Sequence, residues 1–162
     1  MRDSQTTHLE TGGTWQDNEE QAWRLWTASV RRAAVSLQHK RFAAAEIYWR
    51  AAFELALRHL QAAGRGLFTP VHVLEPLQGL AGLFIEQGKW MAARSLFNEV
   101  SEFFQRKNIE LTGMAERLLN AIALRIAQAQ RQNPLPVADN VEELPLAAVA
   151  KDIPRPARSA MT

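Results

Sequence analysis

The sequence contains no cysteine and no long apolar run, and its central part has very little proline. The absence of cysteine excludes disulfides, thiolate nucleophiles and cysteine-ligated zinc. No stretch approaches the roughly 18 apolar residues that a membrane-spanning helix needs. The polar amino terminus does not resemble a secretory signal. We therefore expect a soluble cytoplasmic protein that does not enter a membrane.

The sequence also lacks a strong excess of either charge, because 19 basic residues stand against 17 acidic ones, for a formal charge of +2. A nucleic-acid-binding domain gathers Lys and Arg on one face, and a single-strand platform interleaves them with aromatics. The basic residues of the first predicted hairpin fit either an acidic partner or a solvated face paired with nearby glutamates, and the second interpretation is favoured. Nucleic acid is not expected as a partner.

Catalytic and metal-binding patterns are missing as well. The four histidines are scattered, without ligand spacing such as H-E-x-x-H. Glu46 and Glu54 lie eight residues apart, but nothing in the sequence predicts burial that would raise a carboxyl pKa. We predict no catalytic residue, no metal and no cofactor. Two roles remain open for Trp15, Trp23 and Trp26: they cap the apolar end of the fold, or they form a binding hot spot.

Proline and glycine divide the chain into three zones. Residues 1–16 are polar and carry two adjacent glycines, which indicates a flexible arm. Residues 17–131 hold only two prolines and form the predicted domain, whereas residues 132–162 hold the other five. Proline at that density prevents a helix, so the tail is predicted to be disordered. It is either a linker or carries a docking motif at 144–150.

The central zone is predicted to be all-α. Good helix formers dominate it, and apolar residues recur every three or four positions. Thr69 before Pro70 is typical of a helix start, which we place near residue 70 despite Pro76. Gly64 and Gly88 are typical of helix ends. Short connections between such helices force antiparallel packing. The expected helices span about 17–39, 41–63, 70–88, 89–106 and 109–131.

Two segments of this zone repeat one pattern. FAAAEIYWRAAF, which begins at Phe42, aligns with WMAARSLFNEVS, which begins at Trp90. The first aromatic is expected to fill the gap under the preceding helix, and the alanine three residues later allows two helices to approach closely. The next aromatic closes the contact with the following hairpin. Gly88 supplies the positive φ that reverses the chain before the second copy. The further aligned pairs are Ala45 with Ala93, Trp49 with Phe97, and Ala52 with Val100.

These positions resemble the tetratricopeptide repeat (TPR) family. The better copy consists of Leu77, Leu80, Ala81, Phe84, Gly88, Trp90, Ala93, Phe97 and Val100, and the second half of the other copy of Phe42, Ala45, Trp49 and Ala52. The copies lie 48 residues apart, which looks like the long-helix, kinesin-light-chain-type variant of bacterial TPR proteins. The resemblance covers about residues 20–106 and implies a short right-handed superhelix of about five helices, with the last helix as a cap or half repeat.

The resemblance also implies a function and a site. TPR stacks bind extended peptides or helices in a concave surface lined by the first helix of each hairpin, and catalysis is rare among them. The lysine and asparagine clamp for chaperone carboxylates is absent here. The implied groove is mainly apolar, and it either takes a peptide or is covered by a second copy or the tail. Its candidate residues are Ala34, Leu37, Gln38, Gln78, Gly82, Ile85 and Glu86.

We therefore predict a non-catalytic protein-interaction module, an adaptor or scaffold that holds a peptide or an amphipathic helix of another protein. The alternative is a small chaperone or regulator that sequesters a secretion substrate or a transcription factor. Because two repeats are few, pairing of two copies through the open end of the stack is also expected.

Overall fold

The computed structural model describes residues 14–61 and 66–135, which form five helices and no strand. The helices are α1 (Thr14–Gln38), α2 (Phe42–His59), α3 (Pro70–Glu86), α4 (Trp90–Arg106) and α5 (Met114–Gln132). The all-α prediction is confirmed. The predicted arm as far as residue 13, the tail from residue 136 and the Trp15 side chain lie outside the described parts.

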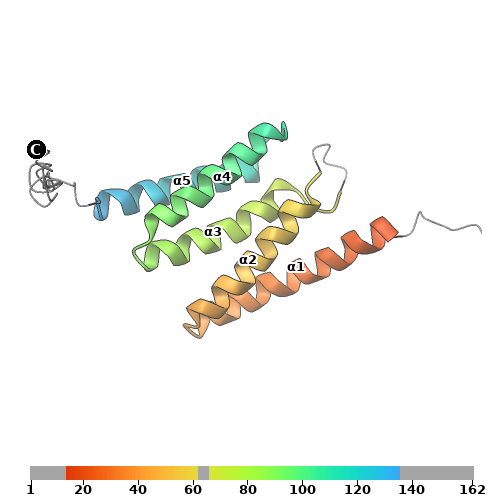
Figure 1. Cartoon of the computed structure of the whole chain (residues 1–162), viewed down its shortest axis with the longest axis horizontal. Helices are drawn as coiled ribbons and strands as arrows, with labels where there is room; N and C mark the ends of the chain where they lie inside the picture. The colour runs from red at the N-terminus through yellow and green to blue at the C-terminus, as the bar shows by residue number, and fades with distance from the viewer. Residues whose placement is uncertain (1–13, 62–65, 136–162) are drawn as a thin grey trace, which may run out of the picture.

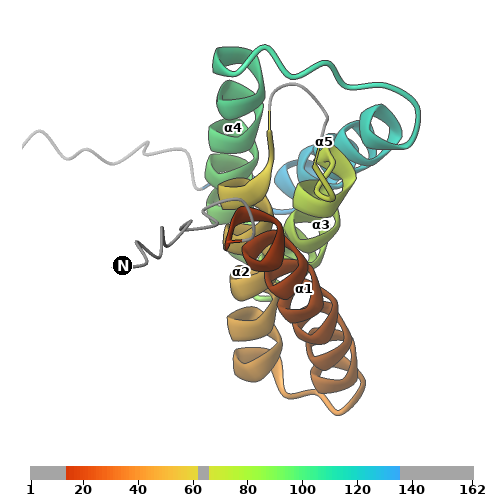
Figure 2. The same ribbon diagram turned by 90° about the vertical axis from the view of Figure 1, so that its right-hand side faces the viewer.

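The helices form a stack of antiparallel hairpins (Figure 1). Helix α2 packs against both α1 and α3, and α3 packs against α4 and α5, which also contact each other. Seen at right angles, α1, α3 and α5 form one layer, and α2 and α4 form the other (Figure 2). The surface of the first layer is therefore made by the first helix of each hairpin and by the last helix.

Three of the four helix connections begin with the same turn. The residue after the helix cap has positive φ in each case: Lys40 (56°), Gly88 (72°) and Asn108 (51°). The amide N–H of the next residue reaches back to the carbonyl five residues earlier, as in Arg41 to Ser36 at 2.8 Å and Lys89 to Phe84 at 2.7 Å. This is a Schellman motif, which satisfies carbonyl groups at a helix end. The predicted positive φ at Gly88 is confirmed.

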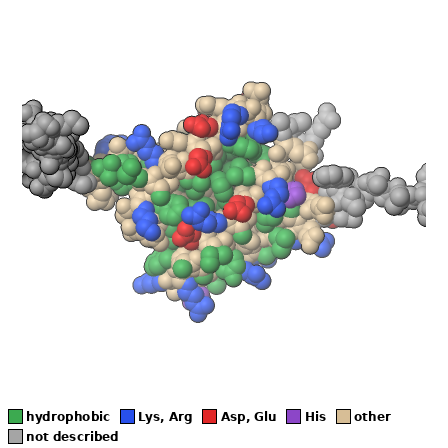
Figure 3. Space-filling model, viewed as in Figure 1, with side chains coloured by type: hydrophobic (Ala, Val, Ile, Leu, Met, Phe, Trp, Pro, Cys, Tyr) green, Lys and Arg blue, Asp and Glu red, His purple; other side chains and the backbone are tan. Residues whose placement is uncertain are grey.

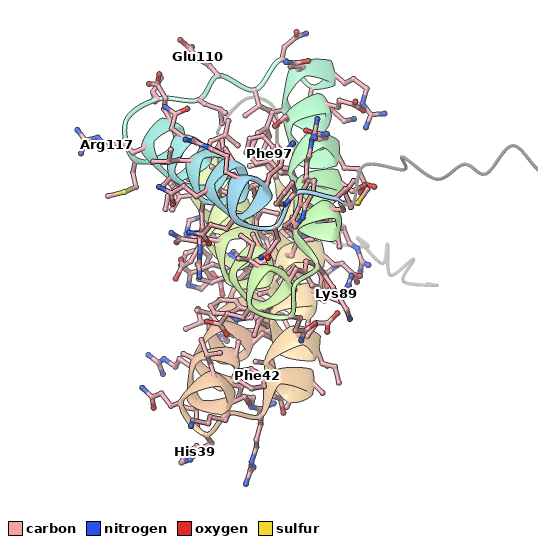
Figure 4. All side chains as sticks on the ribbon, turned by 90° about the vertical axis from the view of Figure 1, so that its left-hand side faces the viewer. His39, Phe42, Lys89, Phe97, Glu110 and Arg117 are labelled. Carbon is pink, nitrogen blue, oxygen red and sulfur yellow. The ribbon has the colours of Figure 1, made fainter. Side chains whose placement is uncertain are left out.

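The aligned segments start helices at the same place, since α2 begins at Phe42 and α4 at Trp90. Of the 13 residues on which the TPR resemblance rests, 11 are buried or half-buried, and Gly88 lies in its turn. Phe42 contradicts the pattern, because 41% of it is exposed. Trp90 is covered by the end of α5, where its Nε1–H donates to the Asn133 carbonyl at 2.9 Å. Phe42 instead lies close to His39 at the tip of the first hairpin (Figure 4).

Three helix boundaries also differ from the prediction. Helix α1 begins at Thr14, so the last three residues of the predicted flexible arm are helical. Helix α2 ends at His59, not near Gly64, because Leu60 is already extended, with φ −71° and ψ 119°. Leu60 packs against the core in this conformation, and Phe68 is buried there before α3 begins. Helix α5 begins at Met114, about five residues later than expected, because Gly113 has φ 57° and interrupts the helical path.

Pro76 lies inside α3 and is buried there, although proline has no amide hydrogen to donate. In a regular helix that amide would bond to the carbonyl of His72. The indole Nε1–H of Trp26 donates to this carbonyl at 3.0 Å. A side chain of α1 thus supplies the donor that α3 lacks, and this bond holds the first two helices of the layer together at one end.

Candidate peptide-binding groove

A cavity of about 290 Å³ lies on the layer formed by α1, α3 and α5. Leu37 of α1 and Arg125 of α5 line it from the two flanking helices, and Trp49 reaches it from α2. Most of the lining comes from one face of α3: Glu75, Gln78, Gly79, Gly82, Leu83 and Glu86. We call this cavity the groove.

Four of the seven predicted groove residues line this cavity: Leu37, Gln78, Gly82 and Glu86. The other three, Ala34, Gln38 and Ile85, lie on α1 and α3 without lining it, with Ala34 and Gln38 exposed and Ile85 half-buried. The cavity therefore brings together four of the predicted residues, and it extends one turn further toward the start of α3, to Glu75.

Two glycines of α3 have close neighbours on this face. A Cβ atom on Gly79 would lie 2.6 Å from Cδ2 and 2.7 Å from Nε1 of Trp49, so the indole packs directly on the helix backbone. A Cβ atom on Gly82 would lie 2.8 Å from Nη1 of Arg125. Both side chains approach α3 where it lacks a side chain of its own. Trp49 forms part of the wall, and the Arg125 side chain crosses the face at Gly82.

Three charged residues line the groove, namely Glu75, Glu86 and Arg125. In the described part of the chain the one ion pair within 4.0 Å joins Glu46 to Arg50, so none of the three is paired there. Glu75 is half-buried, and this burial raises the pKa of its carboxyl group. The buried Nε1–H of Trp49 also has no acceptor among the described residues.

Sequence reasoning missed five groove residues: Trp49, Glu75, Gly79, Leu83 and Arg125. Extending the helical period of Gln78, Gly82 and Glu86 back by one turn would have found Glu75, since these positions share a face. No local signal identifies Arg125, because its place depends on how α5 packs against α3.

A second cavity, of about 310 Å³, lies between α2 and α4 in the other layer. Its lining is Phe53, Leu57, Glu99, Val100, Glu102, Phe103 and Arg106. On the face shown in Figure 3, acidic and basic side chains are interspersed and hydrophobic ones lie between them.

The amino-terminal tryptophans form part of a packed aromatic cluster between α1 and α3. Trp23 and Trp26 are stacked at 5.6 Å, and the His72 ring lies 4.7 and 4.9 Å from them. Phe68 packs against Trp23 at 5.6 Å. Trp26 is buried and Trp23 half-buried, so the pair serves the contact between helices and does not form an open hot spot.

His72 also caps α3, because its Nδ1 accepts the amide N–H of Thr69 at 2.9 Å. This bond requires Nδ1 to be unprotonated. Burial lowers the pKa of the His72 ring, which favours the same neutral form. The histidine therefore has a structural role here, and no group of three or more potential metal ligands occurs among the described residues.

No helix in the described ranges has the length and apolar character to cross a membrane. Comparison of the chain with protein-family models, curated proteins and solved structures found no match.

Proposed function

We propose that this protein is a non-catalytic interaction module that holds a segment of another protein in the groove. The observation that carries the proposal is the groove itself, which combines apolar walls and an exposed rim with charges that form no ion pair within the described ranges. Such a surface suits a peptide or an amphipathic helix, with side chains of the partner entering pockets between the helices.

The TPR resemblance supports the same proposal. The two aligned segments begin helices 48 residues apart, and each follows a turn with a residue of positive φ two positions before the helix. In a TPR-like stack the layer with α1, α3 and α5 corresponds to the peptide-binding surface. The outer face of α5 carries Arg117, Asn120, Gln128 and Arg131, as expected of a helix that ends such a stack, and Leu124, which is 56% exposed, lies between them.

The test is affinity capture from a lysate of the source organism, with bound proteins identified by mass spectrometry. Leu37→Arg places a long charged side chain in the groove at a residue that is 39% exposed, so the fold should tolerate it. Ile47→Arg is the matched control, because Ile47 is 66% exposed on α2 and does not line the groove.

We expect a partner that wild type and Ile47→Arg retain and Leu37→Arg loses. Retention by all three proteins would contradict the proposal. If the partner then stays in a stable 1:1 complex through gel filtration, the protein is a sequestering chaperone or regulator. A complex that dissociates on the column favours an adaptor.

A further inference from the structure

The charges of the groove have a fixed order along α3. Glu75 and Glu86 lie on the same face, 11 residues apart, which is about 16 Å along a helix axis. Between them, the guanidinium of Arg125 lies over Gly82, seven residues after Glu75 and four before Glu86. A segment lying along α3 therefore meets a negative, a positive and again a negative charge.

These charges are available to a partner. No carboxylate or basic group of the described residues lies within ion-pair distance of any of the three. The Glu86 and Arg125 side chains are exposed, whereas Glu75 is half-buried and has no counterion among the described residues. A carboxylate in that position loses part of its hydration and gains no compensating charge. Trp49 lines the same groove, is more than nine-tenths buried, and has an indole N–H for which the described part of the chain provides no acceptor.

We propose that the partner segment carries basic, acidic and basic side chains in that order, with its two cations facing Glu75 and Glu86 and its anion facing Arg125. This inference rests on the proposed function of the groove and specifies the chemistry of the occupant. A helical segment parallel to α3 would place its two cations about 11 residues apart. An extended segment would cover the same length with about five residues.

The uncharged lining determines which side of the segment faces the groove. Leu37, which is 39% exposed, gives the segment an apolar contact, Leu83 is buried in the floor of the groove, and Gln78 lies between the two glutamates as a hydrogen-bonding group. The partner side chains that alternate with the charges are therefore apolar. The charges fix the register of the segment, and their unequal spacing, seven residues before Gly82 and four after it, distinguishes its two directions. Apolar contact supplies much of the affinity.

The experiment uses the full chain as bait for a phage-displayed library of random 16-residue peptides. The baits are wild type, the double variant Glu75→Gln/Glu86→Gln, the charge reversal Glu75→Lys and the groove-blocking Leu37→Arg. Glu54→Gln/Glu110→Gln is the matched control, because both glutamates are exposed, lie outside the groove and change the net charge equally.

We expect wild type and the control to enrich peptides that carry one basic residue on each side of an acidic residue. A synthetic consensus peptide should bind about tenfold more weakly to Glu75→Gln/Glu86→Gln. Glu75→Lys should select peptides in which one basic residue is replaced by an acidic one. Glu75→Gln alone should raise the midpoint of thermal unfolding and at the same time weaken peptide binding. A glutamate with a purely structural role would not combine a higher midpoint with weaker binding.

The two proposals fail in different ways. If Leu37→Arg abolishes enrichment but the selected peptides show no basic excess, or bind Glu75→Gln/Glu86→Gln as well as wild type, the charge inference is wrong and the groove proposal stands. If wild type enriches no peptide over Leu37→Arg, the groove does not bind peptides and both proposals are wrong.

Discussion

Alanine substitutions at the two glycines of the groove should differ in their effect on stability. Gly79 and Gly82 both lie inside α3, where replacing glycine by alanine stabilises a helix by about 1 kcal/mol. This gain is common to the two sites. The difference between the variants therefore reports the space around each glycine.

The neighbours of the two positions differ in their freedom to move. At Gly79 a Cβ atom would overlap the indole of Trp49, which is only 8% exposed and cannot turn away. Such overpacking costs about 1–3 kcal/mol. At Gly82 the Cβ atom would meet the far end of Arg125, an exposed and flexible side chain. We expect Gly82→Ala to stabilise the protein by about 1 kcal/mol, and Gly79→Ala to be less stable than Gly82→Ala by about 1–3 kcal/mol.

The assay is urea unfolding followed by the helical circular-dichroism signal, with equal slopes required before free energies are compared. A double-mutant cycle supplies the control, because Gly79→Ala should become stabilising in a Trp49→Ala background. Equal stability of the two glycine variants would refute the reasoning. So would a cost of Gly79→Ala that persists when the indole is removed.

Trp26→Phe should cost about 1–3 kcal/mol of unfolding free energy, because it leaves the His72 carbonyl without a donor. In a Pro76→Ala background the restored backbone amide should reduce that cost, and an unchanged cost would mean that the carbonyl is not the cause. Lys40→Gly should stabilise the protein by about 0.5–1 kcal/mol, because Lys40 has φ 56°, and thermal unfolding would show no gain if this turn were unstrained. The pKa of the His72 ring is lower in the folded protein than in the unfolded chain, so the unfolded chain binds the proton more tightly. The contribution of this ring to stability is therefore complete above about pH 6.5 and is lost as the pH falls below that value. Urea unfolding at several pH values should show this loss in wild type and less of it in His72→Asn, which keeps an acceptor for the Thr69 amide but does not titrate.

The sequence by itself determined the features that depend on local chain geometry. The helical period gave the five helices and the buried faces, including Ala45 and Ala93 at equivalent places in α2 and α4. The alignment also placed the start of both helices correctly. Thr69 and Pro70 marked the start of α3 because proline at the first helical position fits the backbone there. Each of these features depends on residues within a few positions of one another.

Only the tertiary structure decided what surrounds each face. The sequence does not show that Trp26 bonds to α3, that Phe42 lies at the tip of a hairpin, or that Arg125 reaches Gly82. Arg125 lies 43 positions after Gly82 in the chain, and their contact depends on the packing of α5 against α3. Periodicity tells which side of a helix is buried, but the distance and angle between helices follow from how all their side chains pack together. The groove could therefore be assigned to a surface from the sequence, whereas the order of its charges could not.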